Sequence, residues 1–357
     1  MSDDFREELP LEDEQQELFE HFHLTVDKGQ APLRIDKFLS DHMADTSRHR
    51  IQLAIAAEYV RVNDKVVKAN YKVRPLDEIA LVMPYQRRGV DIKPEPIPLS
   101  IAYEDDDLMV VDKPAGMVVH PGHGNYEGTL VNALAYYLGK EAAIDEDGRM
   151  GLLVHRIDKD TSGLLVVAKT DVAQIGLASQ FFHHTIERRY LALVWGNLEE
   201  DEGTVDAPIG RDPGDRLRYR VCSDEAQGKH AVTHWKVVER FGYVTLVECV
   251  LETGRTHQIR VHMNYLGHPL FNDERYGGDR ILKGSLYTKY KQFIDNCFAL
   301  CPRQALHART LGFIHPVTKK KISLESEIPS DMSALLDKWR RYAGSHTLEE
   351  EEDGSTI

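Results

Sequence analysis

The chain has 357 residues, of which 42% are hydrophobic, and its net charge is −14 at pH 7. This length allows a sizeable core and two domains. No apolar run approaches the roughly 18 to 20 residues that a membrane helix requires, and the N-terminus lacks the basic and apolar blocks of a signal peptide, so a helical membrane protein is excluded and we expect a cytoplasmic location without membrane contact.

The acidic charge is concentrated at the two ends of the chain. Residues 1–21 carry a net charge of −8 and residues 344–357 carry −5, which leaves −1 for the rest of the molecule. Acidic runs of this kind are typical of solvated, disordered tails, and we expect one at each end. The overall charge therefore does not exclude a nucleic-acid partner, because a basic patch on the folded part remains compatible with it.

A small unit is expected at residues 30–92. Two short helices are predicted, in LRIDKFLSDHM and in TSRHRIQLAIAAEY, with Thr46 or Ser47 as the N-cap of the second. The alternation around Asn63 and Asp64 then predicts a β-hairpin. Residues 28–74 carry ten Lys or Arg and only five Asp or Glu. The outward positions hold cations that we expect to bind RNA phosphates: Arg34, Lys37, Arg48, Arg50, Arg61 and Lys65.

The patterns RIDKFL, SRHRIQLAI and YVRVNDKVVK resemble the small RNA-binding domain named after ribosomal small-subunit protein four. The resemblance covers about fifty residues and implies that this unit contacts RNA. Prolines 94, 96 and 98 stiffen the connection that follows, so we place a domain boundary there. From residue 100 to about 343 strands mix with a few helices, which indicates an α+β fold rather than a doubly wound parallel one.

The segment HRIDKDTSG, residues 155–163, holds Asp158 in a tight polar turn. Residues 151–154 and 164–169 on either side are strongly apolar and predict buried strands. A carboxylate presented between two buried strands is costly unless it is paired or used. Arg156 lies two residues before it. An isolated Asp in a loop is most often structural, so the functional interpretation depends on the rest of the chain.

The segment VVDKPAGMVVHPGHGNYEGTLVNAL, residues 110–134, predicts a strand, a glycine-rich loop and a helix. Its glycines match neither GxGxxG nor a following GK[ST], so both nucleotide-binding fingerprints are excluded. The loop can still bring backbone donors near a phosphate. In ERRYLALVWG, residues 187–196, the alternation predicts a strand with two apolar faces: Tyr190, Ala192 and Val194 on one, Leu191, Leu193 and Trp195 on the other.

The segment ETGRTHQIRVHMNYLGHP, residues 252–269, predicts a strand end, a turn and a helix capped by Thr256. One face of this helix is expected to carry His257, Arg260 and Asn264. Arg255 at the turn and Arg260 on the helix are positioned to meet anions. The cation-rich stretch RDPGDRLRYR, residues 211–220, is expected to be a loop between strands that holds RNA near the pocket or is simply solvated.

The motifs HRIDKDTSG, ERRYLALVWG, GRTHQIRVHM, DKPAGMVVHPG and ALHA together resemble the RNA pseudouridine synthases whose motif is commonly written HRLD. Ile157 stands where that motif has Leu. The resemblance covers roughly residues 100–330. It implies a catalytic domain at 100–343 with a mixed, largely antiparallel sheet and flanking helices, preceded by the helix-helix-hairpin RNA-binding unit.

The resemblance also implies roles for individual residues. Asp158 matches the nucleophile that attacks the target uridine, and Arg260 matches the cation paired with it. Tyr190 matches the residue that stacks on the base and assists removal of the carbon 5 proton. Arg156 matches a residue that fills the gap left by the flipped nucleotide. We expect Arg255 and His257, together with Arg156, to bind the substrate.

Such an isomerisation needs no cofactor and no metal, and the expected partner is ribosomal RNA or a pre-ribosomal particle, bound by a monomer. Two other hypotheses remain. The chain could be a non-catalytic RNA-binding or assembly factor, or a metal-dependent hydrolase with ligands among His120, His123, His155 and His257. The four cysteines, at 222, 249, 297 and 301, are expected to be reduced. The residues leave open which uridines are modified, in which RNA, and whether the carboxylate attacks the ribose or the base.

Overall fold

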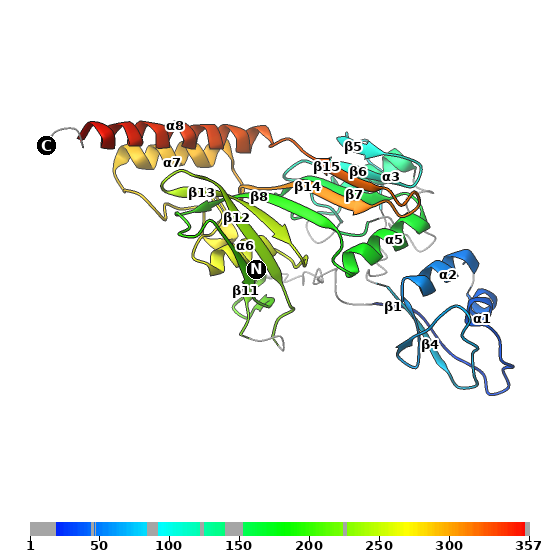
Figure 1. Ribbon diagram of the computed structural model, residues 1–357. Helices are drawn as coiled ribbons and strands as arrows, with labels where there is room; N and C mark the ends of the chain where they lie inside the picture. The colour runs from blue at the N-terminus through cyan, green and yellow to red at the C-terminus, as the bar shows by residue number, and fades with distance from the viewer. Residues whose placement is uncertain are drawn as a thin grey trace, which may run out of the picture.

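The computed structural model describes residues 19–43, 46, 48–83, 92–121, 125–139, 153–223 and 227–353. Its elements mix helices and strands throughout, so the predicted α+β class is confirmed. A small N-terminal unit lies beside a larger domain built on one long sheet (Figure 1).

The N-terminal unit contains a four-stranded sheet in the order β1-β4-β2-β3 and two helices. The strands are β1 (Phe19–Thr25), β2 (Val60–Val62), β3 (Lys65–Val66) and β4 (Glu78–Met83), and the helices are α1 (Ile35–His42) and α2 (Arg48–Ala56). Asn63 and Asp64 join β2 to β3 with φ values of 49° and 63°, as a two-residue hairpin turn requires. The predicted helices and hairpin are confirmed. The proposed N-cap Ser47 lies outside the described residues.

Alternating burial explains why these short segments fold. Phe38 and Leu39 of α1 are 1% and 0% exposed and pack against Ile51 and Ile55 of α2 and against Ile79 of β4 in one core. Strand β1 was not predicted. It pairs antiparallel with β4 and includes residues 19–21, which the sequence analysis assigned to an acidic tail. Its alternate apolar residues Phe22 and Leu24 pack against the core of the unit, and this outweighs the local acidic composition.

The larger domain is built on a nine-stranded sheet in the order β5-β6-β7-β14-β8-β13-β12-β9, with β15 paired to β14. Only the β7–β14 pair is parallel among these described strands. The strands are β5 (Ile101–Glu104), β6 (Leu108–Lys113), β7 (Ser162–Ala168), β8 (Glu187–Trp195), β9 (Glu202–Asp206), β12 (Val232–Arg240), β13 (Val244–Leu251), β14 (Leu306–Ile314) and β15 (Lys321–Glu325). A mixed, largely antiparallel sheet was predicted and is confirmed.

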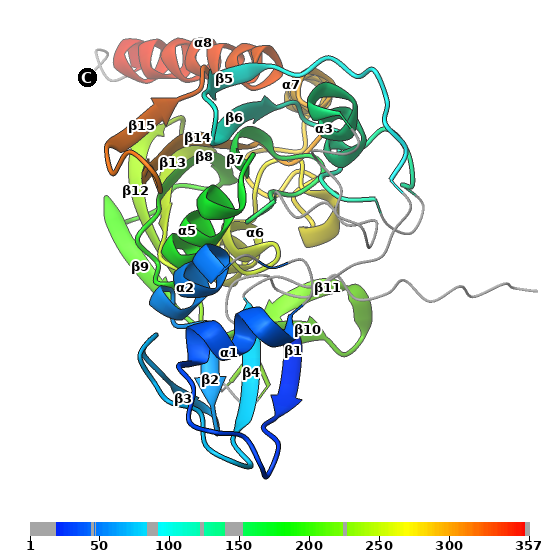
Figure 2. The same ribbon diagram turned by 90° about the vertical axis from the view of Figure 1, so that its right-hand side faces the viewer.

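Helices cover both faces of this sheet (Figures 1 and 2). One face packs against α3 (Leu130–Leu138) and α6 (Gln258–Tyr265), and the other against α5 (Asp171–Phe182), α7 (Thr288–Leu300) and α8 (Ser330–Asp353). Strand β8 follows its predicted alternation. Tyr190, Ala192 and Val194 join the first core, and Leu191, Leu193 and Trp195 join the second.

Three local predictions were wrong. Residues 151–154 were expected to form a strand, but in the described part Leu153 makes only an isolated bridge with Val167. Residues 211–220 were expected to form a loop, but they belong to a hairpin of β10 (Ile209–Asp212) and β11 (Asp215–Val221), because a tight turn at Gly214 lets the charged strands pair. Residues 344–357 were expected to form a disordered acidic tail, but the helix α8 continues as far as Asp353, because glutamates favour helix.

The two units contact each other through α2 and α5, which lie side by side in Figure 2. Ile175 of α5 is 3% exposed and packs into the core of the N-terminal unit. Arg50 of α2 forms an ion pair with Asp171 of α5 at 3.3 Å. All four cysteines are free and buried, as predicted. No helix of the described residues combines the length and apolar character needed to span a bilayer.

Candidate active site

Asp158 lies on the loop before β7, where its side chain is partly exposed and the residue before it is buried. The backbone N–H of Thr161 donates to the carbonyl of Asp158 at 3.1 Å and closes a tight turn. Ile157 is 8% exposed and packs into the core below. The Asp158 side chain is 21% exposed, so its carboxylate lies at the surface of the site while its neighbours are fixed by packing.

Two buried cations hold this loop from behind. The ammonium of Lys113, at the end of β6, donates to the carbonyl of Lys159 at 2.9 Å. The guanidinium of Arg303 donates to the carbonyl of Asp160 at 2.9 Å and pairs with Asp331 of α8 at 2.7 Å. A charged donor such as Arg303 makes a strong hydrogen bond with a backbone carbonyl, and Lys113, whose pKa burial lowers to about 7, adds a second donor, so the loop is anchored on both sides of the exposed carboxylate.

Arg260, on the first turn of α6, lies between two carboxylates. Its Nη1 donates to Oδ2 of Asp158 at 3.0 Å. Its Nε and Nη2 donate to the two oxygens of Asp273 at 2.7 and 2.9 Å, a bidentate pair. The side chains of Arg260 and Asp273 are only 7% and 1% exposed. The predicted proximity of Asp158 and Arg260 is therefore observed, and Asp273 completes the arrangement.

The electrostatics of the site keep Asp158 ionised. Burial raises the pKa of Asp158, but the charge that His257 carries when it is protonated, the charge of Arg260 and the hydrogen bond from Arg260 outweigh it, so its pKa lies below the ordinary value. Burial lowers the pKa of His257 to about 4, which leaves it uncharged at neutral pH, so Arg260 dominates there. Burial raises the pKa of Tyr190, so its phenol keeps its proton at neutral pH.

These groups share one pocket. It encloses about 620 Å³ between protein atoms, including the solvent at its mouth. The walls come from the Asp158 loop, from β8 and from the segment that leads into α6. The predicted catalytic and substrate-binding residues that line it are Arg156, Asp158, Tyr190, Arg255, His257 and Arg260. Three segments far apart in the sequence thus bring all six residues to one pocket.

The start of α6 differs from the prediction. The helix begins at Gln258, and its N-cap is His257 in the left-handed conformation (φ 58°), without a side-chain capping bond. Thr256 is therefore not the cap, and His257 does not share a helix face with Arg260. Instead the Gln258 side chain accepts hydrogen bonds from the Arg255 N–H at 2.9 Å and the Thr253 hydroxyl at 2.7 Å. These bonds close the turn that leads into the helix.

The predicted RNA-binding cations lie on the N-terminal unit, and none lines the pocket. Asp36 is buried and pairs with Arg34 at 3.1 Å and Arg48 at 2.9 Å. Arg50 pairs with Asp171, Arg61 is half-buried, and Lys37 and Lys65 are exposed. Part of the basic character of this unit is thus compensated by Asp36 within it and by Asp171 of the larger domain, which was not predicted from the sequence.

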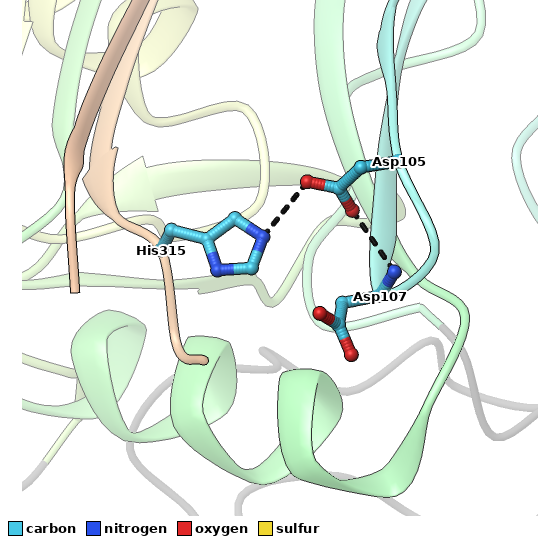
Figure 3. A group of neighbouring side chains, drawn as sticks. All are labelled: Asp105, Asp107 and His315. Atoms are coloured by element: carbon cyan, nitrogen blue, oxygen red, sulfur yellow. Dashed lines mark hydrogen bonds and ion pairs between the residues drawn. The ribbon is translucent and has the colours of Figure 1, made fainter. Parts of the chain in front are cut away.

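The histidines proposed as metal ligands do not form a group among the described residues, and His123 lies outside them. His155 accepts a hydrogen bond from the backbone N–H of Val166 at 2.9 Å and stacks on Phe181. The group with ligand-like spacing in the described part is instead Asp105, Asp107 and His315 (Figure 3).

That group is occupied by internal hydrogen bonds. Asp105 accepts from the Asp107 N–H at 2.9 Å and bonds Nε2 of His315 at 2.9 Å, as Figure 3 shows. The other ring nitrogen of His315 accepts from the backbone N–H groups of Val317 and Thr318. With Nδ1 accepting, Nε2 is the donor, so the histidine has no lone pair left for a cation. The cluster therefore has a structural role: it links the end of β5 to the end of β14.

Asp273 and Gln258 were not predicted from the sequence. Asp273 follows the buried residues Leu270 and Phe271, and an acid at such a position is the signal that it has a buried partner. Gln258 lies inside the GRTHQIR motif, but nothing in its spacing distinguishes a turn-closing amide from a solvated one. Asp273 acts on the site from behind, through Arg260, whereas Gln258 lines the pocket and closes the turn before α6.

Known protein families match both units of the chain. Residues 107–265 match the family model described as RNA pseudouridylate synthase, and residues 33–79 match that of the S4 domain. A Bacillus subtilis protein named as an RNA pseudouridine synthase is 45% identical over 318 residues, covering 89% of this chain and 98% of that protein. The Zymomonas mobilis protein named ribosomal large subunit pseudouridine synthase D is 44% identical, covering 85% and 92%.

Solved structures are similar as well. Human RNA pseudouridylate synthase domain containing 1 aligns with a TM-score of 0.50 at 26% identity and covers 67% of this chain and 87% of that one. Human RNA pseudouridylate synthase domain containing 4 aligns with a TM-score of 0.53 at 24% identity, covering 68% and 93%, and shows the shared fold.

Proposed function

The chain belongs to the RNA pseudouridine synthase family and carries an S4 domain, and from this premise we propose that it isomerises specific uridines of large-subunit ribosomal RNA, with Asp158 as the nucleophile. In this reaction the bond between ribose C1′ and base N1 breaks and a bond between C1′ and C5 forms. The C5 proton leaves and N1 gains a proton, so no atom is added and no oxidant or energy donor is needed.

The observation that carries this proposal is the hydrogen bond of 3.0 Å between Arg260 and the carboxylate of Asp158 in the wall of a pocket. A carboxylate is a useful nucleophile only when it is deprotonated and positioned against the reacting atom. The depressed pKa of Asp158 supplies the first condition, and the anchored loop supplies the second.

The other pocket residues fit the remaining steps. Tyr190 lies on the pocket wall as a buried aromatic, which suits stacking on an extruded base. The half-buried Arg156 next to the nucleophile is placed to fill the space left in the RNA, which offsets an unstacking cost of roughly a few kcal/mol. Arg255 and His257 line the same pocket and bind the nucleotide around the base.

The choice of RNA rests on the relatives and on the S4 unit. Several relatives are named ribosomal large subunit pseudouridine synthase D, including the one from Nitrosomonas europaea, which is 44% identical. The exposed Lys37 and Lys65 provide phosphate contacts on the N-terminal unit. We place the reaction in the cytoplasm, on ribosomal RNA or its precursor particles, carried out by a monomer.

The test is a map of pseudouridines in the ribosomal RNA of cells that lack the protein. We expect specific large-subunit positions to revert to uridine and to be restored by a plasmid that expresses the wild-type chain. Unchanged modification of every position in ribosomal and transfer RNA would contradict the proposal and would favour a non-catalytic RNA-binding protein. If pseudouridines were lost only from transfer RNA, the proposed reaction would stand, but ribosomal RNA would be rejected as the substrate.

A further inference from the structure

Arg303 lies just before β14 and binds four parts of the larger domain from one buried position. Its side chain is 6% exposed. Nη1 donates to the carbonyl of Asp160 at 2.9 Å and to that of Leu306 at 3.0 Å. Nε and Nη2 donate to the two carboxylate oxygens of Asp331 at 2.7 and 3.1 Å, and Nη2 also reaches the hydroxyl of Ser162 at 3.4 Å. A guanidinium suits this task, because its five N–H donors form a rigid fork.

The bond to Asp160 fixes a peptide group on which Asp158 depends. The Asp160 carbonyl and the Thr161 N–H belong to one planar trans peptide unit, in which they point in opposite directions. Arg303 binds the carbonyl end, and the N–H end donates to the carbonyl of Asp158 at 3.1 Å. A rotation of this unit would break both hydrogen bonds. Arg303 therefore restrains the turn that carries the Asp158 side chain, although it does not line the pocket.

Asp331 is held in turn by the packing of α8. It lies in the first turn of this helix, and its Oδ1 accepts from the Met332 N–H at 2.7 Å. Leu335 and Trp339 follow one and two turns later, are 0% exposed and share a core with residues of α7 and β8. Among the described residues α8 provides no wall of the pocket, so the Asp331–Arg303 pair is its connection to the catalytic loop.

We propose that Arg303 is a positioning residue for the isomerisation, and that its pair with Asp331 makes α8 part of the support of the catalytic loop. With the carbonyl of Asp160 restrained, the carboxylate of Asp158 keeps one direction toward the pocket while RNA is bound. This inference rests on the proposed function of the pocket, but it assigns a role to two residues and a helix that lie outside that pocket.

The first test is Arg303→Lys. Lysine keeps the positive charge beside Asp331, but its single ammonium cannot reproduce the fork that also reaches Asp160. We expect the single-turnover rate of pseudouridine formation at saturating RNA to fall about 10- to 100-fold, because a small misplacement of a reacting group is costly. The dissociation constant of the RNA should stay within about twofold, since Arg303 does not line the pocket.

Asp331→Asn approaches the same contact from the helix. The amide loses the charge that holds the guanidinium, so the single-turnover rate should fall about 3- to 10-fold with unchanged RNA affinity. Asp331 is partly exposed, and its replacement therefore provides the test if Arg303→Lys does not fold. In the double variant the two rate losses should not multiply, because both act on the hydrogen bond to Asp160.

Leu335→Ala is the control that separates positioning from stability. The loss of this buried side chain should lower the melting temperature at least as much as Asp331→Asn does. It leaves the Asp331–Arg303 pair in place, so the rate measured well below the melting transition should stay within about twofold of that of the wild-type protein.

The outcomes are distinguishable. A wild-type rate in folded Arg303→Lys or, where that variant does not fold, in Asp331→Asn would overturn the positioning role and leave the proposed function intact. An equal loss of rate in Leu335→Ala would do the same. A wild-type protein that forms no pseudouridine in any ribosomal or transfer RNA would instead overturn the proposed function and, with it, this inference.

Discussion

Burial raises the pKa of both Asp158 and Tyr190, but only at Asp158 do the neighbouring cations outweigh it. The result is an ionised carboxylate and a protonated phenol in one pocket. A neutral Tyr190 can stack on a base, and its hydroxyl can take up the C5 proton only as it passes its own proton to another acceptor, such as N1 of the base or water, but it does not compete with Asp158 as an anion. Environment thus gives two acidic groups different tasks.

Replacing Tyr190 with Phe separates stacking from proton transfer. Tyr190→Phe keeps the ring that contacts the base, so the dissociation constant of the RNA should remain near that of wild type. The single-turnover rate should fall about 100-fold or more if the hydroxyl assists removal of the C5 proton. Tyr190→Ala is the control, because it should weaken RNA binding as well. An undiminished rate for Tyr190→Phe would restrict this residue to stacking.

At the scale of elements, the site depends on the parallel pairing of β7 with β14 directly after the Asp158 loop. Gly163 pairs with Ala308, and its φ is +116°. A Cβ on Gly163 would lie 2.2 Å from the carbonyl oxygen of Ala308. Only glycine lets the two backbones approach so closely, which explains the TSG that ends the motif.

We therefore expect Gly163→Ala to be strongly destabilising. Backbone strain and the clash together should lower the free energy of unfolding by about 3 kcal/mol or more. Gly242→Ala is a matched control, since Gly242 has φ +87° but a Cβ on it would meet nothing within 4 Å, and it should cost only about 1 to 2 kcal/mol. Urea unfolding of both variants measures the difference, and equal losses would show that the β14 carbonyl is not the obstacle.

Elements whose apolar residues recur with a clear period were predictable from the sequence. Elements that depend on contacts between distant parts of the chain were not. The alternation in residues 187–196 gave both faces of β8, and the apolar spacing around Phe38 gave α1. The start of α6 was missed because His257 adopts a left-handed backbone, which is rare for a non-glycine residue. Strand β1 was missed because its pairing partner β4 lies more than fifty residues away.

At the scale of the whole molecule, the sequence predicted which motifs meet but not how they are supported. Asp158, Tyr190 and Arg260 lie in separate motifs, and their meeting in one pocket followed from the family resemblance. The position of Asp273 after two buried residues indicates a buried partner but does not identify Arg260 as that partner. The pairing of Arg34 and Arg48 with the buried Asp36 was not predicted, because an ion pair leaves no periodic signal in the sequence.

Buried histidines predict how the stability of the molecule depends on pH. Burial lowers the pKa of His155 to about 3 and of His262 to about 4, against 6.5 in an unfolded chain. Between pH 6.5 and 4 the unfolded state binds protons that the folded state does not. The free energy of unfolding should therefore fall with decreasing pH, by up to about 1.4 kcal/mol per pH unit for each histidine.

Urea unfolding at pH values from 7.5 to 4.5 checks this dependence. His262→Gln should reduce the slope by the share of one histidine, whereas His49→Gln, at an exposed position, should leave it unchanged. A free energy of unfolding that stays constant between pH 6.5 and 4.5 would show that the buried imidazoles do not control acid stability.

The proposed chemistry depends above all on the nucleophilic role of Asp158, and the variant Asp158→Asn tests that role most directly. The amide keeps the size and one acceptor oxygen of the side chain but cannot attack the uridine. We predict that purified Asp158→Asn binds the RNA as tightly as the wild-type protein, within about threefold, and forms no pseudouridine in a single-turnover assay. Pseudouridine formation by this variant at a rate near that of the wild-type protein would contradict the nucleophilic role.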